Sequence, residues 1–244
     1  MTEVPNAYES CCMHEVLGET LRPGGFSLTD LAVQYCGLSH ENSVLDLGCG
    51  RGATVNYLHE QYEISAIGID PSEKLIDDAR NNYNYGEFVL GKGENLPFDD
   101  ASFDCVFAEC TLSLMDADSA VKQVHRVLKE NGWFVINDVY AKNPEAIGGL
   151  GSFSVNSCMR GLHDLNKLES KLEQAGFSIV YLEDCSHYLK ELLVKVVFSY
   201  GSMCEFWNTA SDNCINGDDF YEALKQCKPG YFMLSARKGG KACE

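Results

Sequence analysis

The sequence lacks the features that would place the protein in or across a membrane. It has no continuous apolar stretch of about 18 residues, which is the length that a membrane-spanning helix needs. Its first twenty residues include Glu9, Glu15 and Glu19, and they contain no basic leader followed by an apolar run. We therefore expect a cytoplasmic protein with no membrane segment.

Basic residues are scarce as well. Lysine and arginine total 19 against 36 aspartate and glutamate residues, which gives a formal net charge of -17. A surface with this balance repels phosphate backbones and anionic lipids on average. Neither nucleic acid nor a membrane surface is therefore expected as a partner.

Paired cysteine motifs are missing, although the chain has 12 cysteines. There is no C-x-x-C pair, and the spacings match no zinc finger, so no metal site is expected. In a reducing cytoplasm the cysteines should be thiols, and most should be small buried side chains. A few remain candidates for substrate chemistry.

Internal repeats and low-complexity segments are also absent, and the composition, 45% hydrophobic and 23% charged, is that of a globular protein. Periodic apolar patterns predict strands at 44–47, 64–69, 88–90, 103–108, 133–139, 177–182 and 231–236. Helices are predicted at 53–62, 72–82, 117–128, 165–174 and 189–208. This alternation indicates one α/β domain, spanning 1–244, in which a parallel sheet carries helices on both faces.

Three regions lie outside the alternation. Residues 1–40 are expected to form N-terminal cap helices before a ligand-binding core at 41–140. Residues 187–220 form an insertion before the last strand, and we expect it over one edge of the sheet. A loop rich in glycine and serine at 148–157 is expected at the mouth of the sheet, where loops carry function.

The first predicted strand ends in a glycine-rich turn at 48–52, Gly-Cys-Gly-Arg-Gly. With Ala53 it satisfies the G-x-G-x-x-G/A pattern, and Asp70 follows at about the 20-residue separation of an acid that binds a ribose hydroxyl. Taken alone, the turn permits a nicotinamide dinucleotide. Asp46 favours another ligand, because a carboxylate there suits an ammonium group better than a pyrophosphate. S-adenosylmethionine supplies such an ammonium group.

The segment 44–52, Val-Leu-Asp-Leu-Gly-Cys-Gly-Arg-Gly, resembles the first motif of class I S-adenosylmethionine-dependent methyltransferases. Later segments agree with the family in order: the ribose-binding motif at 67–72, the region of the fourth strand at 94–98 and 102–104, and the approach to the fifth strand at 126–132. Within this class the chain is similar to the methyltransferase type 11 and arsenite methyltransferase-like group. The resemblance implies a Rossmann-like, doubly wound sheet of seven mostly parallel strands with an antiparallel last strand, and S-adenosylmethionine as the cofactor.

The resemblance also implies cofactor-binding residues. Asp46, Gly48 and Gly50 are expected to bind the methionine end of the cofactor, and Asp70 is expected to bind its ribose. Pro71 would lie on one face of the adenine, with Gly93 and Glu94 at the adenine edge. Glu109 would lie in the wall that faces the methyl group. One position departs from the family pattern, because Lys92 stands where an aspartate usually meets the adenine amino group. Either Glu94 or the backbone would have to replace that contact.

The expected acceptor is a small molecule, since transfer from a sulfonium needs alignment more than it needs a strong base. Its pocket would lie between the N-terminal segment, the loop at 148–157 and the insertion. Aromatic residues that would either line this pocket or belong to the core are Phe153, Tyr188, Tyr200, Phe206 and Trp207. His163 is either a candidate base or a structural histidine.

The cysteines suggest a more specific alternative. Residues 158–162, together with 175–177, are similar to the corresponding stretch of arsenite methyltransferases, and Cys49 also matches that family. Because trivalent arsenic prefers sulfur ligands, Cys158 and Cys49 would hold a metalloid substrate. The candidates for a third thiol are Cys11, Cys12 and Cys204. A different alternative is a catalytically silent methyltransferase-like module that binds a partner.

Overall fold

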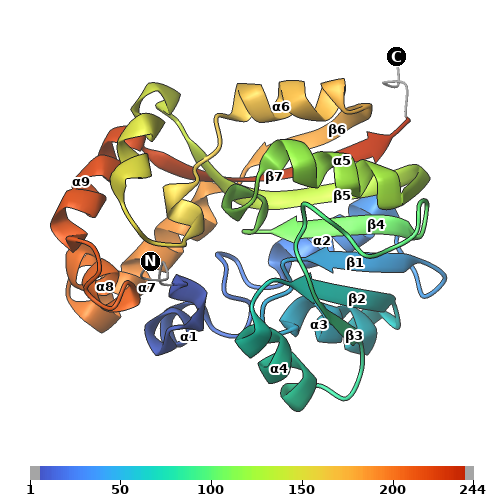
Figure 1. Cartoon of the computed structure of the whole chain (residues 1–244), viewed down its shortest axis with the longest axis horizontal. Coiled ribbons are helices and arrows are strands. Elements are labelled where there is room, and N and C mark those ends of the chain that lie inside the picture. The colour runs from blue at the N-terminus through green and yellow to red at the C-terminus, as the bar shows by residue number, and fades with distance from the viewer. Residues whose placement is uncertain (1–5, 240–244) are drawn as a thin grey trace.

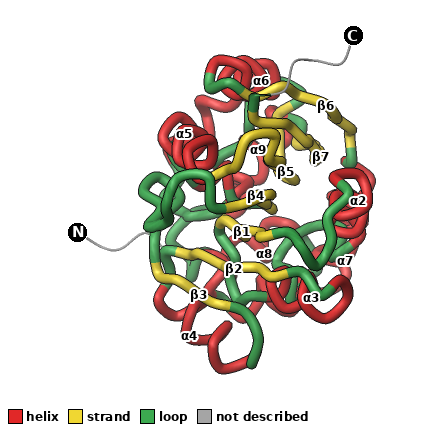
Figure 2. Tube along the Cα trace, turned by 90° about the vertical axis from the view of Figure 1, so that its right-hand side faces the viewer, coloured by secondary structure: helices red, strands yellow, loops and turns green. Residues whose placement is uncertain are grey.

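The computed structural model describes residues 6–239, which form one seven-stranded sheet with helices on both faces (Figure 1, Figure 2). The strand order is β3-β2-β1-β4-β5-β7-β6. Strands β1 to β5 run parallel, whereas β7 is antiparallel to both β5 and β6. The strands are β1 (Ser43–Leu47), β2 (Ser65–Asp70), β3 (Glu87–Leu90), β4 (Phe103–Glu109), β5 (Leu128–Ala141), β6 (Phe177–Asp184) and β7 (Pro229–Lys238). The predicted Rossmann-like sheet is thereby confirmed.

The two faces of the sheet bury separate sets of apolar side chains. Along β4, Cys105 and Phe107 belong to one core cluster, and Val106 and Ala108 belong to the other, as the two-residue period of a strand requires. The helices that contribute to the first cluster include α2 (Ser27–Cys36), α3 (Ala53–Tyr62) and α4 (Glu73–Asn82). Those that contribute to the second are α5 (Ala117–Val127) and α6 (Leu165–Gln174).

A group of four helices, here called the cap, lies beyond the carboxyl ends of the parallel strands, at the left of Figure 1. The cap consists of α1 (Cys11–Leu17), α7 (Ser186–Tyr200), α8 (Met203–Ala210) and α9 (Gly217–Cys227). Helix α1 contacts both α7 and α8, so segments from opposite ends of the chain form one unit. The insertion at 187–220 therefore covers the carboxyl ends of the strands and not an edge strand.

Three local predictions differ from the structure. The apolar segment at 189–208 forms two helices, α7 and α8, because the chain turns at Gly201, whose φ is +75°. The predicted loop at 148–157 is partly a 3-10 helix, η3 (Pro144–Ser152), which packs against α9. Strand β5 begins before the predicted turn at Asn131, where φ is +62°, and the turn falls inside the strand as an irregularity in its pairing with β4.

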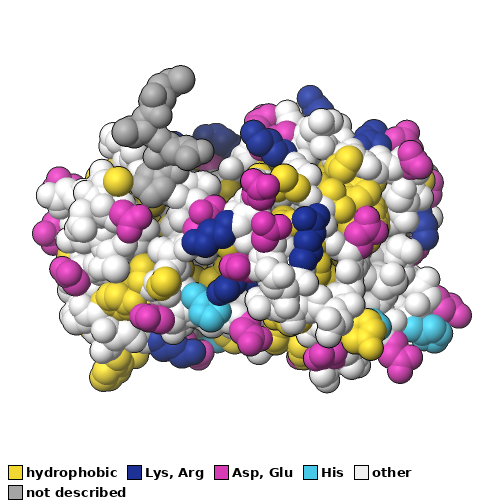
Figure 3. Space-filling view, turned by 60° about the horizontal axis from the view of Figure 1, so that its bottom comes forward, with side chains coloured by type: hydrophobic (Ala, Val, Ile, Leu, Met, Phe, Trp, Pro, Cys, Tyr) yellow, Lys and Arg dark blue, Asp and Glu magenta, His cyan; other side chains and the backbone are white. Residues whose placement is uncertain are grey.

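Within residues 6–239, no helix has the length and apolar character needed to cross a membrane. The face drawn in Figure 3 shows acidic side chains spread among separate lysines and arginines. No continuous basic surface is visible on that face.

Candidate active site

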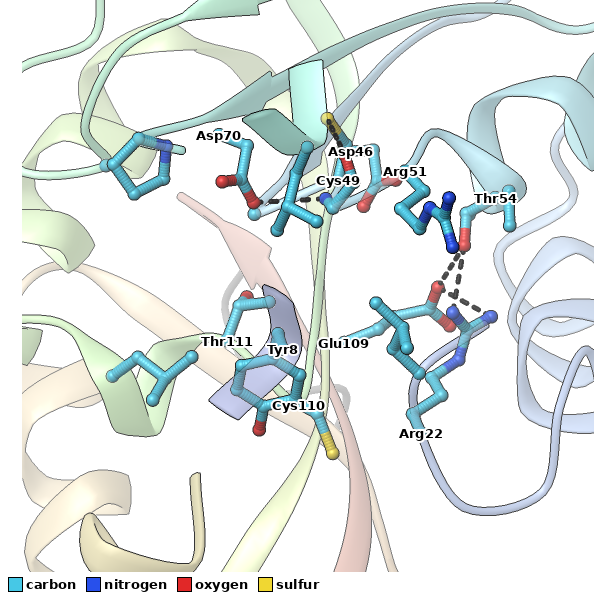
Figure 4. Close-up of a pocket in the computed structure, with 18 of the residues that line it drawn as sticks. Tyr8, Arg22, Asp46, Cys49, Arg51, Thr54, Asp70, Glu109, Cys110 and Thr111 are labelled. Atoms are coloured by element: carbon cyan, nitrogen blue, oxygen red, sulfur yellow. Dashed lines mark hydrogen bonds and ion pairs between the residues drawn. The ribbon is translucent and has the colours of Figure 1, made fainter. Parts of the chain in front are cut away.

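A cavity, here called the first cavity, lies at the carboxyl ends of β1, β2 and β4 (Figure 4). Its walls come from the glycine-rich turn at 48–52, these strand ends and residues 19–22 of the N-terminal segment. The lining includes every residue to which the resemblance assigned a cofactor role: Asp46, Gly48, Gly50, Asp70, Pro71, Gly93, Glu94 and Glu109.

The glycine-rich turn is shaped by close contacts that exclude side chains. The amides of Gly48 and Cys49 donate to the Ile69 carbonyl, at 2.8 and 3.1 Å, and fasten the turn to the end of β2. Gly48 has a φ of +79°, and a Cβ there would lie 2.5 Å from Cγ2 of Thr111. Only glycine combines this left-handed backbone with such a close approach, so the turn keeps its backbone exposed to the cavity.

Asp70 links the end of β2 to this turn. Its Oδ2 accepts from the Gly50 amide at 3.0 Å, and its Oδ1 accepts from the Ser72 amide at 2.8 Å. Burial raises the pKa of Asp70, and the two hydrogen bonds oppose that shift. The carboxylate is therefore held in one orientation at the cavity wall, with lone pairs left for a ligand.

Asp46 differs from the other acidic residues at the cavity in that its carboxyl group has no hydrogen-bond donor among the described residues. Its side chain is 3% exposed, and no group within residues 6–239 donates a hydrogen bond to its carboxyl oxygens. Burial, and then the nearby charge of Glu109, raise the pKa of Asp46 to about 8. A buried carboxyl group without a donor is costly unless a ligand supplies one, and a cation would satisfy it best.

Glu109 is, by contrast, fully engaged by the protein. Its carboxylate forms an ion pair with Arg22 at 2.9 Å and accepts from Thr54 at 2.9 Å and from Thr29 and Asn137 at 3.0 Å each. Figure 4 shows Arg22 and Thr54 converging on it. Arg22 also lines the cavity, and its buried Nε has no partner among the described residues. Arg22 comes from the N-terminal segment, and sequence reasoning missed it because no local motif marks it.

The far end of the first cavity, around Pro71, is bordered by apolar side chains that the sequence did not single out, namely Leu75, Leu114 and Met115. Glu94 lies here, but its Oε1 already accepts from the Asp116 amide at 3.0 Å and so supports the start of α5. Lys92 also lines the cavity and is exposed.

A second cavity adjoins the first beneath the cap. The two cavities share Tyr8, Leu21 and Cys110 in their walls. The second cavity is lined mainly by apolar residues of α1, α7 and α8, and its described lining contains no aspartate, glutamate, histidine, lysine or arginine. It therefore suits an apolar molecule.

The junction between the two cavities is built around Cys110. This residue has a φ of +59°, which is unusual for a non-glycine residue, and its amide donates to the Asn137 carbonyl at 2.6 Å. Its thiol lies within hydrogen-bonding range of the Cys158 thiol and 3.6 Å from the Tyr231 hydroxyl. The Cys158 amide donates to the Tyr8 hydroxyl at 3.1 Å. Cys110 lies two residues beyond the predicted strand at 103–108 and directly after the observed β4, and this position near a strand end was the signal that could have identified it.

Neutral groups dominate this junction. Burial raises the pKa of Tyr8, and the hydrogen bond with Cys158 together with burial raises the pKa of Cys110. Both remain protonated near neutral pH. The junction therefore offers hydroxyl and thiol groups and no anionic base.

The cysteines predicted to act together do not meet. Cys49 packs in the glycine-rich turn, where a Cβ on Gly68 would lie 2.7 Å from its sulfur, and it lines the first cavity only. Cys158 lines the second cavity, beside Cys110. The proposed third ligands, Cys11, Cys12 and Cys204, line neither cavity. Within the described part of the chain, no group of three histidine, cysteine, aspartate or glutamate residues could hold a metal ion.

His163 and the aromatic candidates are divided between core and cavity. His163 Nε2 lies 3.3 Å from the buried Asp138 carboxylate and outside both cavities. Among the aromatic candidates, Phe206 and Trp207 line the second cavity. The other three make contacts elsewhere: Phe153 packs on Phe220, Tyr188 on Gly24 and His187, and Tyr200 donates to Glu15.

Comparisons with known proteins agree with this geometry. Residues 45–136 match the methyltransferase domain family. An uncharacterized methyltransferase of Synechocystis sp. is 32% identical over 170 residues, which cover 66% of this chain and 79% of that protein. The uncharacterized methyltransferase YodH of Bacillus subtilis is also 32% identical, but the match covers only 50% of this chain and 54% of that protein.

The fold is likewise similar to solved structures. Phosphoethanolamine N-methyltransferase 2 of Haemonchus contortus, in complex with S-adenosyl-L-methionine, superposes with a TM-score of 0.73 at 16% identity. The superposition covers 94% of this chain and 56% of that one. At this identity the likeness concerns the fold alone.

Proposed function

The chain belongs to the class I S-adenosylmethionine-dependent methyltransferases, and from this premise we propose that it methylates a small, largely apolar organic molecule held in the second cavity. The observation that carries the proposal is the apolar second cavity, which meets the first cavity at Tyr8, Leu21 and Cys110. A cofactor in one cavity and an acceptor in the other would meet at this junction.

Two side chains in the wall of the first cavity, one acidic and one basic, suit the charged groups of the cofactor. When bound, S-adenosylmethionine supplies an electrophilic methyl carbon on a sulfonium, and its amino-acid end carries both an ammonium and a carboxylate. Asp46 lacks a donor, and Arg22 Nε lacks an acceptor. We infer that the Asp46 carboxylate, which has no donor from the protein, binds the ammonium, and that the nearby Arg22 guanidinium attracts the carboxylate by its charge.

The remaining cofactor contacts follow from position. Asp70 is held by two backbone amides, so its free lone pairs are oriented for the ribose hydroxyls. Pro71, Leu75 and Met115 would enclose the adenine ring. Glu94 keeps its bond to the Asp116 amide, so we assign the adenine edge chiefly to the backbone near Gly93.

The junction would act by alignment and by exclusion of water. Tyr8 is fixed by its bond to the Cys158 amide, and Cys110 is fixed by its strained backbone, so both present a rigid wall to the reacting atoms. Because the described lining of the second cavity contains no anionic base, the acceptor atom must be nucleophilic without strong assistance from the protein. The absence of lysine and arginine from that lining also argues against a phosphorylated acceptor such as phosphoethanolamine.

Filling the second cavity should stop methyl transfer and leave the cofactor bound. Leu193 on α7 lines the cavity, so Leu193→Trp should lower turnover of a lipophilic acceptor about 100-fold, the order of loss that misalignment causes. Val194→Trp is the matched control, because Val194 lies on the same helix and is 54% exposed. Transfer of labelled methyl to a panel of lipophilic thioethers and aromatic amines is measured alongside calorimetric binding of S-adenosylmethionine.

Equal loss of turnover in the Leu193→Trp and Val194→Trp variants would refute the placement of the acceptor. Efficient methylation of phosphoethanolamine in place of the lipophilic panel would also refute it.

One observation favours a second candidate, methylation of trivalent arsenic or a related thiophilic metalloid. Two thiols, those of Cys110 and Cys158, lie together at the junction. Soft metalloid centres bind thiolates, so this pair would hold the substrate beside the methyl group. The pair differs from the one predicted from sequence, in which Cys49 stood in place of Cys110.

The second candidate predicts methylated arsenic when the protein is incubated with S-adenosylmethionine, arsenite and excess thiol, with products identified by mass spectrometry. Cys158→Ser and Cys110→Ser should each abolish this product without changing affinity for the cofactor. The exposed Cys214→Ser is the control and should behave as wild type. No arsenic product from the wild-type protein, with cofactor binding intact, removes this candidate.

A further inference from the structure

Asp138 on β5 is a buried carboxylate that lies outside both cavities and yet connects the segments around them. Its side chain is fully buried, and it lines neither cavity. Its Oδ1 accepts from the Ser113 hydroxyl and the Val139 amide, at 2.8 Å each, and its Oδ2 accepts from the Ser113 amide at 2.9 Å. The Nε2 of His163 lies 3.3 Å from Oδ2. The protein itself therefore satisfies this carboxylate, away from solvent and away from any ligand.

The partners of this carboxylate belong to the two segments that carry the junction thiols. Ser113 lies in the 3-10 helix η2 (Leu112–Leu114), three residues after Cys110. His163 follows the 3-10 helix η4 (Cys158–Arg160), whose first residue is the other junction cysteine. Both cysteines line the second cavity. The carboxylate therefore ties both junction segments to the sheet.

The two segments are attached to β5 in different ways. The His163 amide donates to the Val139 carbonyl at 3.1 Å, and the Ala141 amide donates to the His163 carbonyl at 2.9 Å, so the backbone after η4 is paired with the strand. Among the described residues, the hydrogen bonds between η2 and β5 are those that Ser113 gives to Asp138. The two segments also touch, because a Cβ added at Gly161 would overlap the Ser113 carbonyl oxygen. The position of η2 against η4 therefore depends on Asp138.

Resting on the proposed function, we propose that Asp138 is a positioning residue for methyl transfer, which through Ser113 holds Cys110 beside Cys158 at the junction of the two cavities. Leu114, at the end of η2, lines the first cavity, so a displaced η2 would also move part of that wall. A misplacement of about 1 Å can cost about 100-fold in rate. Loss of the link should therefore act on the transfer step more than on binding.

Asp138→Asn tests the link without a change in side-chain size. A carboxamide has one acceptor atom where the carboxylate has two, so in either orientation its amino group faces a backbone N–H, that of Ser113 or that of Val139. The variant should lower kcat for a lipophilic acceptor about 10- to 100-fold, while the acceptor KM and the affinity for S-adenosylmethionine change by no more than about threefold. Ser113→Ala, which removes the hydroxyl bond alone, should lower kcat about 3- to 10-fold.

The thiol pair reports the same geometry without cofactor or acceptor. Phenylarsine oxide bridges two neighbouring thiols: the arsenic forms two As–S bonds, and its oxygen leaves as water with both thiol protons. Peptide mass spectrometry should find Cys110 bridged to Cys158 in the wild-type protein, and bridging should be about 10-fold slower in Asp138→Asn.

The matched control is Tyr62→Phe, which also removes one hydrogen bond to a carboxylate. The Tyr62 hydroxyl donates to Asp30 at 2.8 Å, and neither residue lines either cavity. This variant should bridge the thiols and transfer methyl groups at wild-type rates.

If Asp138→Asn fails to fold, the same two measurements on Ser113→Ala decide the matter. Bridging at the wild-type rate in the variants, equal slowing in Tyr62→Phe, or no bridging in the wild-type protein would overturn the inference. A loss of stability with kcat and bridging unchanged would show that Asp138 has a structural role alone. Bridging that depends on Asp138, with no methyl transfer to any lipophilic acceptor, would refute only the proposed function.

Discussion

Replacing Glu109 by leucine is expected to lower the free energy of unfolding by about 3–5 kcal/mol, because the change leaves Arg22 as an uncompensated buried charge. The two side chains are 2% and 4% exposed, so solvent cannot take over the lost interaction. Thr54 and Thr29 also lose the acceptor that they share. Chemical denaturation of the cofactor-free protein measures the effect.

The matched control is an exposed ion pair. Lys129 lies 2.8 Å from Asp104, but its side chain is 43% exposed, so Lys129→Met should cost no more than about 1 kcal/mol. The double variant Arg22→Met with Glu109→Leu should recover much of the loss, because it removes both charges together. A Glu109→Leu variant no less stable than Lys129→Met would show that the buried cluster is not a stabilising unit.

The cofactor half of the site could be predicted because its residues lie within or beside strand ends. Asp46, Gly48 and Gly50 lie within a stretch of five consecutive residues, and Asp70 is the last residue of the next strand, so local pattern alone brings them to one edge of the sheet. The prediction of S-adenosylmethionine over a nicotinamide dinucleotide depended on Asp46 and on the resemblance of 44–52 to the first methyltransferase motif, and the family comparisons support it. The other cofactor-binding residues were assigned from the resemblance to class I methyltransferases.

The residues that reach the site from the N-terminal segment and the cap could not be predicted in the same way. Arg22 and Trp207 reach the site through the N-terminal segment and α8, and their positions depend on packing between distant parts of the chain. Cys158 lies at the junction, but its neighbour there is Cys110 and not Cys49, because a sequence pattern does not say which loops meet above a sheet. Nor does a pattern show the left-handed backbone that sets Cys110 in the junction.

Asp46 and Glu109 differ in what the protein supplies to their carboxyl groups. The Asp46 carboxyl group has no donor and so costs stability in the ligand-free protein, but it lies in a cavity wall where a bound molecule can supply the missing donor. Glu109 shows the opposite arrangement, because the protein itself satisfies the carboxylate. The site therefore contains polar groups that the protein itself satisfies, such as Glu109, beside groups such as Asp46 that only a ligand can satisfy.

Binding of S-adenosylmethionine should release a proton from Asp46. In the ligand-free protein the pKa of this carboxyl group is raised to about 8, so it is protonated at pH 6 to 7. Pairing with an ammonium group favours the ionised form and lowers the pKa, so one proton leaves as the pair forms. Affinity should rise with pH by up to about tenfold per unit below pH 8, and fall above it as the α-amino group of the ligand loses its own proton.

Calorimetric titration in buffers of different ionisation enthalpy counts the released protons directly. Asp46→Asn should bind the cofactor about 10- to 100-fold more weakly at pH 7.5, show no proton release and lose the rise in affinity with pH. Asp70→Asn is the control: the pKa of Asp70 is also raised, but two backbone amides already satisfy its carboxylate, so this variant should bind more weakly yet still release the proton. Proton release that persists in Asp46→Asn and disappears in Asp70→Asn would transfer the ammonium contact from Asp46 to Asp70, because the proton lost on binding identifies the carboxyl group that meets the cation.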